Sequence, residues 1–182
     1  MDQIGKDELS IELLSTRYDL SPFDSGNPEL DDFLKNDALK EQQELLSKTH
    51  LCFYKNHVAG FITLAADSIR VKKDKLDGSQ IIEDCEYPAY PCILIARLAI
   101  DKKVQKRGIG GFLLLLAIGL ALDGPLGCRY LSVDPKQEAL EYYKKFGFGF
   151  WTSSKRRMYL NIRDVARELR PDESLDPWTV EE

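Results

Sequence analysis

The stretch from Cys92 to Leu122 constrains what this chain can fold into more than any other part of it. Residues 92–100 carry a single charge, residues 102–107 are mostly basic, and residues 108–122 are uncharged and contain several glycines. This order predicts a buried strand, a short turn and a buried helix. Because the first N–H groups of a helix have no partner within the helix, a turn that leads into a helix forms a binding site for an anion.

The turn between the two apolar runs is suited to a phosphate. Glycines at 108, 110 and 111 let a ligand approach the backbone closely. In a chain with a formal net charge of -5, the concentration of positive charge just before them indicates a phosphate or pyrophosphate ligand. The alternative is a solvated basic turn whose glycines serve tight packing. The basic residues are Lys102, Lys103, Lys106 and Arg107.

Two common phosphate-binding motifs do not match this turn. A P-loop requires a Lys followed by Ser or Thr after its second glycine, and that pair is missing here. A dinucleotide-binding fingerprint needs a third glycine where Leu113 stands. The sequence therefore argues against ATP and NAD as the ligand of this turn.

Length and composition predict one soluble domain over residues 1–182. The chain is 43% hydrophobic and 30% charged, and its acidic balance argues against general nucleic-acid binding, although a local basic patch remains compatible with it. The polar, acidic start predicts no secretory signal, and the apolar run over 108–122 is shorter than the roughly 20 residues that span a bilayer. The four cysteines form no metal-ligand pattern, so we expect reduced structural thiols, no metal and a cytoplasmic location.

The periodicity of the chain predicts a mixed sheet covered by helices on both faces, an α/β or α+β class of fold. We expect an exposed loop over 72–90 and, over 164–182, a charged tail that starts as a short helix. Helices are expected at 28–47, 108–122 and 134–146. Strands are expected at 9–18, 50–54, 58–69, 92–100, 128–133, 148–151 and 157–162.

Capping residues mark the ends of two of these helices. Asn27 is the expected N-cap of the first helix, with Pro28 in its first turn. Asp134 is the expected N-cap of the helix over 134–146, with Gln137 as its capping-box partner and Gly147 as its stop.

Three spaced motifs resemble the GNAT family of N-acetyltransferases. Residues 105–110 fit the pattern (Gln/Arg)-x-x-Gly-x-(Gly/Ala), which holds the pyrophosphate of acetyl-CoA in that family. Residues 97–101 resemble the strand that pairs with the pantetheine arm, and residues 139–148 resemble the signature Ala-x-x-x-Tyr-x-x-x-Gly-Phe. The resemblance implies an acetyl-CoA-dependent acyltransferase with a single-domain, largely antiparallel sheet flanked by helices.

The resemblance also implies roles for individual residues. Tyr143 would act as the general acid that protonates the leaving thiolate, with Tyr142 as second choice; the alternative is that Tyr143 is only a core residue. Arg97 is either one half of a structural ion pair or a substrate contact, and no general base is identified. The cofactor would be held by Leu98, Ala99 and Ile100 at the acetyl and pantetheine groups and by Gln105, Lys106, Arg107, Gly108, Ile109, Gly110 and Gly111 at the pyrophosphate.

A narrower likeness concerns the acceptor. Residues 23–34 and 60–66 are similar to a subgroup that includes toxins of toxin–antitoxin pairs, which acetylate the amino group of aminoacyl-tRNA. This implies aminoacyl-tRNA as acceptor, an antitoxin partner and a homodimer. A protein or small amine as acceptor, or a non-catalytic CoA-binding module, stays open, and the basic residues below are alternatively solvated surface. The candidates for tRNA contact are Lys144, Lys145, Lys155, Arg156, Arg157, Lys72, Lys73 and Lys75.

Overall fold

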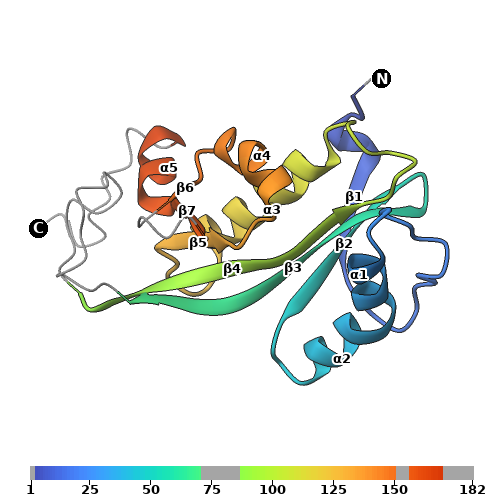
Figure 1. Cartoon of the computed structure of the whole chain (residues 1–182), viewed down its shortest axis with the longest axis horizontal. Coiled ribbons are helices and arrows are strands. Elements are labelled where there is room, and N and C mark those ends of the chain that lie inside the picture. Colours follow the sequence, from blue (N-terminus) through green and yellow to red (C-terminus); the bar gives the residue numbers. More distant parts are fainter. Residues whose placement is uncertain (1–2, 71–86, 151–155, 170–182) are drawn as a thin grey trace, which may run out of the picture.

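A seven-stranded sheet organises the molecule (Figure 1). The computed structural model describes residues 3–70, 87–150 and 156–169. The strand order is β1-β2-β3-β4-β5-β7-β6, and every neighbouring pair is antiparallel except β4 and β5, which run parallel. The strands are β1 (Leu9–Leu13), β2 (Lys48–Tyr54), β3 (His57–Arg70), β4 (Ala89–Ile100), β5 (Tyr130–Val133), β6 (Gly149–Phe150) and β7 (Met158–Asn161).

Helices cover both faces of the sheet, as predicted. Figure 1 shows α1 and α2 on one face and α3, α4 and α5 on the other. Each face has its own cluster of buried apolar side chains, one built around α3 and one beneath α1 and α2. The helices are α1 (Pro28–Asp32), α2 (Ala38–Gln43), α3 (Ile109–Asp123), α4 (Leu140–Lys144) and α5 (Ile162–Leu169).

The helix predicted over 28–47 forms, but it is shorter and interrupted. Asn27 caps α1 by accepting a hydrogen bond from the Glu29 N–H at 3.1 Å, as expected. A π-helical turn over Phe33–Asp37 then separates α1 from α2. Leu45 has a φ of 60° and is 85% exposed, so it lies outside the helix and does not extend the buried apolar stripe.

The helix predicted over 108–122 is confirmed as α3, which begins at Ile109 and ends at Asp123. It is apolar on all sides, a pattern typical of a helix enclosed by protein. Leu113, Leu114 and Ala117 are fully buried, and α3 packs against β3, β4 and β5. This packing fixes the end of the helix that faces the glycine-rich turn.

Several predicted boundaries were wrong for tertiary reasons. The first strand ends at Leu13 instead of Tyr18. Asp134 does not cap a helix, because its carboxylate binds the Arg157 guanidinium. A 3₁₀ turn with Lys136 as its N-cap comes first, and α4 starts only at Leu140. The predicted capping box of Asp134 with Gln137 therefore does not form. Gly147 does end the helical segment: its φ is 83° and its N–H donates to the Lys144 carbonyl at 3.0 Å.

The remaining strands follow the prediction in part. The hairpin of β2 and β3 is confirmed, and β5 and β7 lie within the predicted ranges. β4 starts three residues before the predicted Cys92 and is only partly buried along its second half, because β5 does not accompany it there. Residues 71–86, Trp151 and residues 170–182 lie outside the described residues, and with them the greater part of the predicted loop and of the tail.

A buried hydroxyl pair joins β2 to β3. Thr49 and Thr63 face each other in the register, both are fully buried, and their Oγ1 atoms are 2.8 Å apart. Replacing one threonine by valine is expected to lower the free energy of unfolding by about 1–3 kcal/mol, because it leaves the other hydroxyl buried without this partner. Chemical denaturation of Thr49→Val, Thr63→Val and the double variant measures the effect.

The double variant is expected to lose clearly less than the sum of the two single variants, because it leaves neither hydroxyl behind. Additive losses would contradict a direct interaction between the two side chains.

Candidate active site

The predicted anion turn connects β4 to α3. Lys106 and Gly108 adopt positive φ angles of 62° and 92°, which turn the chain sharply before the helix begins. The N–H groups of Ile109, Gly110 and Gly111 lie in the first turn of α3, where they have no partner within the helix. The structure therefore brings the predicted glycines and the basic residues before them to one helix N-terminus, the arrangement that binds anions.

Two of the glycines at this helix end lie against aromatic side chains. A Cβ at Gly110 would overlap the hydroxyl of Tyr142, and one at Gly111 would lie 3.1 Å from the ring of Phe146. Both aromatic side chains come from the segment around α4, which therefore packs directly on the start of α3. The Tyr142 hydroxyl is buried without a hydrogen-bond partner, and burial raises its pKa to about 12.

An open strand edge begins beside the turn. β5 pairs with β4 only over Cys92–Ile95, whereas β3 accompanies β4 to Ile100. Within the described residues, β4 therefore has no paired strand on its β5 side from Ala96 to Ile100. The predicted residues Leu98, Ala99 and Ile100 lie in this segment.

A pocket of 340 Å³ opens where β4 and β5 separate. Tyr143 forms one side of it and Leu98 and Arg97 another, while Asn27 and Leu30 close it from α1. The sequence indicated that Asn27 begins a helix, but nothing in it indicated that α1 faces the same pocket as Tyr143. The acidic and basic side chains around the pocket are Glu29, Asp134, Lys136, Glu138 and Arg97.

Tyr143 is the only described tyrosine in this pocket, and only 7% of its surface is exposed. Its ring contacts Tyr142 and Phe148, with centroid distances of 5.5 Å in each case. Burial, and to a smaller extent the neighbouring Tyr142, raises the pKa of Tyr143 well above the ordinary value of a phenol. Tyr143 therefore stays protonated at neutral pH and can give up a proton only to a strong base.

Arg97 lies in the pocket without the carboxylate partner that one interpretation predicted. Its guanidinium donates to the Ala96 carbonyl at 2.9 Å and stacks over the ring of Phe33 at 5.0 Å. No carboxylate of the described residues pairs with it, and its Nε has no hydrogen-bond partner. The described residues thus supply no ion pair for Arg97, and both interpretations, the structural ion pair and the substrate contact, stay predictions.

The candidate tRNA-binding residues separate into different environments. Arg157 is held by Asp67 and Asp134 at 2.7 and 2.6 Å, and this pairing lowers the pKa of Asp134. Lys144 pairs with Glu141 at 2.6 Å, whereas Lys145 and Arg156 are exposed. The remaining candidates, Lys155, Lys72, Lys73 and Lys75, lie outside the described residues.

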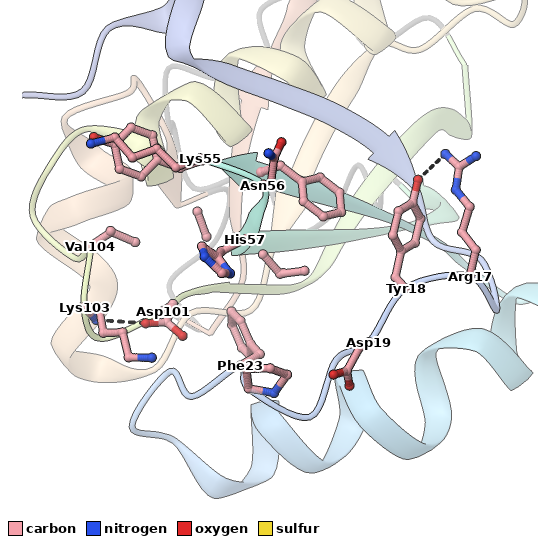
Figure 2. A pocket seen from close by; sticks show the side chains of 15 residues that line it. Arg17, Tyr18, Asp19, Phe23, Lys55, Asn56, His57, Asp101, Lys103 and Val104 are labelled. Atoms are coloured by element: carbon pink, nitrogen blue, oxygen red, sulfur yellow. Dashed lines mark hydrogen bonds between the residues drawn. The ribbon is translucent and has the colours of Figure 1, made fainter.

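A larger hollow of 620 Å³ lies on the far side of the loop that follows β4 (Figure 2). The β2–β3 turn with Lys55 and His57, the segment around Phe23, and the loop with Asp101 and Lys103 surround it. Neither Tyr143 nor the open edge of β4 at Leu98 lines this hollow. We therefore place the chemistry in the smaller pocket.

The described part of the chain holds no group of three or more His, Cys, Asp or Glu side chains arranged to bind a metal. None of its helices is both long enough and apolar enough to cross a membrane. Cys52, Cys92 and Cys128 are free thiols, and burial raises the pKa of Cys52 and Cys92 to about 12.

Comparison with known proteins gives consistent matches. The sequence model of the acetyltransferase (GNAT) family matches residues 11–148. A tRNA-acetylating toxin of Mycobacterium tuberculosis is 31% identical over 169 residues, which span 87% of this chain and 95% of the toxin.

Solved structures of toxins share the fold. AtaT complexed with acetyl-methionyl-tRNAfMet superposes with a TM-score of 0.79 at 22% identity, over 88% of this chain and 99% of AtaT. A tyrosine-to-phenylalanine mutant of AtaT, bound to the C-terminus of the antitoxin AtaR and to acetyl-CoA, superposes with a TM-score of 0.72 at 21% identity, over 90% and 99% of the two chains.

The contact between Tyr142 and the start of α3 can be tested by substitution. Gly110→Ala is expected to lower the free energy of unfolding by about 1–3 kcal/mol, because the added methyl group overlaps the Tyr142 hydroxyl. Adding Tyr142→Phe removes the overlapping atom and should restore most of the loss. Urea denaturation measures both effects.

Gly119→Ala, in the middle of the same helix, is the matched control. A Cβ there meets nothing within 4 Å, so this variant should be as stable as the wild type or slightly more stable. A Gly110→Ala defect that persists unchanged in the double variant would show that Tyr142 is not its cause.

Proposed function

The chain belongs to the acetyltransferase (GNAT) family, and on that premise we propose that it transfers the acetyl group of acetyl-CoA to the amino group of an aminoacyl-tRNA. The observation that carries the proposal is the position of Tyr143. Its buried phenol lines the pocket that opens beside the free edge of β4, and the anion-binding turn lies beyond the end of the same strand.

The residues of the turn fit the pyrophosphate of acetyl-CoA. The N–H groups of Ile109, Gly110 and Gly111 have no partner within the first turn of α3, so they can donate to phosphate oxygens. Lys106 and Arg107 precede these N–H groups in the turn and add positive charge to it; the Arg107 guanidinium lies over the Tyr54 ring, 5.4 Å from its centroid. Gln105 takes part through the backbone of the loop, because its side-chain amide is engaged by two carbonyl oxygens of the protein itself.

Acetyl-CoA supplies an acetyl group activated as a thioester, and the chain supplies three functions around it. In the open segment of β4 over Leu98, Ala99 and Ile100, the N–H groups of Leu98 and Ile100 point away from β3, and we assign them to orient the pantetheine arm and polarise the thioester carbonyl. Tyr143 donates its proton to the thiolate as the amine displaces it. A phenol can serve in this step because its ordinary pKa is close to that of a thiol. Burial raises the pKa of Tyr143, which keeps it protonated at neutral pH and also makes it a weaker proton donor.

The acidic side chains at the pocket favour a positively charged acceptor amine. Glu29, Asp134 and Glu138 line it, and Lys136 pairs with Glu29 at 3.1 Å. Asp134 is a weak base, because the Arg157 guanidinium holds its pKa below the usual range. Glu138, the pocket carboxylate without an ion-pair partner among the described residues, can therefore attract the ammonium form of the acceptor.

The similar proteins support aminoacyl-tRNA as the acceptor. The M. tuberculosis relative is a tRNA-acetylating toxin, and AtaT is solved with an acetylated aminoacyl-tRNA. On this chain the exposed Lys145 follows Tyr143 by two residues, and the exposed Arg156 helps to lower the pKa of Asp134 in the pocket; both offer positive charge to a phosphate backbone. We extend the proposal to a cytoplasmic location, an antitoxin partner and a homodimer, in line with the toxin–antitoxin complexes among the similar structures.

Tyr143→Phe is expected to lower kcat by about a hundredfold or more, because it removes the proton of the general acid. The affinity for acetyl-CoA should stay within a factor of about two. Release of free CoA thiol in the presence of acceptor measures the first quantity, and calorimetry measures the second. Because burial raises the pKa of Tyr143, the wild-type rate should not fall as pH approaches 10, where an ordinary phenol ionises.

Tyr142→Phe is the matched control, since it removes a hydroxyl from the adjacent residue. It should retain most of the turnover. Loss of turnover in Tyr142→Phe together with normal turnover in Tyr143→Phe would assign the proton to Tyr142.

Incubation with acetyl-CoA and a pool of charged tRNA is expected to yield N-acetylated aminoacyl-tRNA, detected by mass spectrometry of the released amino acids. Expression of the active protein should stop bacterial growth, and expression of Tyr143→Phe should not. Absence of both the tRNA product and the growth arrest would overturn the acceptor. Turnover on a protein or a small amine would then identify the acceptor class, and tight acetyl-CoA binding without turnover on any amine would indicate a binding module.

A further inference from the structure

Two loops that are about 80 residues apart in the sequence are joined by hydrogen bonds beside the candidate active site. One precedes α1 and contains Asp24 and Ser25, and the other follows β4 and contains Asp101, Lys102 and Gln105. The Lys102 N–H donates to the Asp24 carbonyl at 2.8 Å, and the Asp24 N–H donates to the Asp101 carboxylate at 3.1 Å. The Gln105 side chain donates to the Ser25 carbonyl at 2.8 Å.

The amide group of Gln105 is committed to the protein. Its Nε2 donates both to the Ser25 carbonyl and to the Ile100 carbonyl, the latter at 3.0 Å. An amide nitrogen has two protons, so these two bonds use its donor capacity. Gln105 therefore fixes the start of the anion-binding turn from within and does not direct its amide at a phosphate.

Asp101 anchors the same loop to the sheet. It is only 5% exposed, its carboxylate accepts the Lys103 N–H at 2.9 Å (Figure 2), and its own N–H donates to the Ala59 carbonyl of β3 at 2.9 Å. A buried carboxylate is costly without partners, and here the N–H groups of Lys103 and Asp24 supply them and hold Asp101 in place. The loop after β4 thus has little freedom to move relative to the strands.

The segment joined to this loop carries one wall of the pocket. The N–H and the hydroxyl of Ser25 donate to the Asp31 carboxylate of α1 at 2.8 and 2.7 Å. Asn27 caps α1, and Asn27, Glu29 and Leu30 line the pocket opposite β4. A displacement of Ser25 therefore displaces the wall that the acceptor meets.

We propose that Gln105 is a positioning residue that holds the acceptor wall, by fixing Ser25 and, through it, α1 to the loop that binds acetyl-CoA. The proposal rests on the proposed function, which identifies this loop and this wall. We call the hydrogen bonds from the Gln105 amide to the Ser25 and Ile100 carbonyls the brace. The brace orders α1 before the acceptor binds, so that less conformational entropy is lost on binding. Acceptor affinity then depends on a residue of the cofactor motif whose side chain touches neither substrate.

Gln105→Met tests the brace, because methionine has nearly the same shape and no donor. The KM for aminoacyl-tRNA should rise about tenfold, and by a larger factor than the Kd for acetyl-CoA, because the bond to the Ser25 carbonyl reaches the segment that carries the pocket wall. Gln42→Met is the matched control. Gln42 also joins two backbone segments, donating to the Leu14 carbonyl at 2.8 Å and accepting the Thr49 N–H at 3.1 Å, but it does not line the pocket.

Amide hydrogen exchange tests the brace without an acceptor. Exchange over residues 24–32 should quicken in Gln105→Met and stay as in the wild type in Gln42→Met. Ser25→Ala removes the hydrogen bond from the Ser25 hydroxyl to the Asp31 carboxylate, which connects the brace to α1. It should also quicken exchange over residues 24–32, and it replaces Gln105→Met as the test if that variant does not fold.

Unchanged exchange over 24–32 in both brace variants would overturn the proposal. A loss of acetyl-CoA affinity at constant acceptor KM would overturn it as well, because it would place the Gln105 side chain on the phosphate. A wild-type protein that acetylates no tRNA would instead contradict the proposed function, and the exchange measurement would still decide on the brace.

Discussion

The parallel pairing of β4 with β5 ends after four residue pairs, and the candidate site depends on this early separation. Backbone N–H and C=O groups inside a protein need partners, so a strand that loses its neighbour presents a row of groups to whatever fills the gap. β3 still pairs with β4 as far as Ile100, with a register shift at Ala96, and this pairing holds the open segment on one side. β3 thus holds one side of this segment, and the other side is open to a ligand.

Helix α3 connects β4 to β5 and positions the basic turn that precedes it. Its apolar surface packs against β3, β4 and β5, so the start of the helix is held at the end of β4. The glycine-rich turn and its basic residues come to this point as a consequence. A chain with an overall charge of -5 thereby presents the proposed site for a polyanionic cofactor at one end of the open edge and a pocket with several carboxylates at the other. The two substrates of an acetyl transfer, one anionic and one an ammonium ion before it reacts, fit these two ends.

The loop that follows β4 connects the two ends of the open edge through hydrogen bonds. Gln105 and Asp101 hold the segment before α1, and α1 in turn carries Asn27, Glu29 and Leu30 to the pocket. On this view the glutamine of the cofactor motif serves the acceptor side as well. Tyr143 lies between both ends on α4, which is itself packed on the start of α3 through Tyr142 and Phe146.

The sequence by itself determined the parts that depend on neighbouring residues: the apolar helix α3, the hairpin of β2 and β3, the Asn27 cap, the stop at Gly147 and the glycine-rich turn. These follow from patterns within a few residues, which act in the same way in any fold. Only the tertiary structure decided that Arg157 takes Asp134 away from its helix, that Arg97 stacks on Phe33 without a carboxylate partner among the described residues, and that α1 faces Tyr143. Each of these contacts joins segments that are far apart in the chain, and their partners are chosen by how the helices pack on the sheet, which no local pattern records.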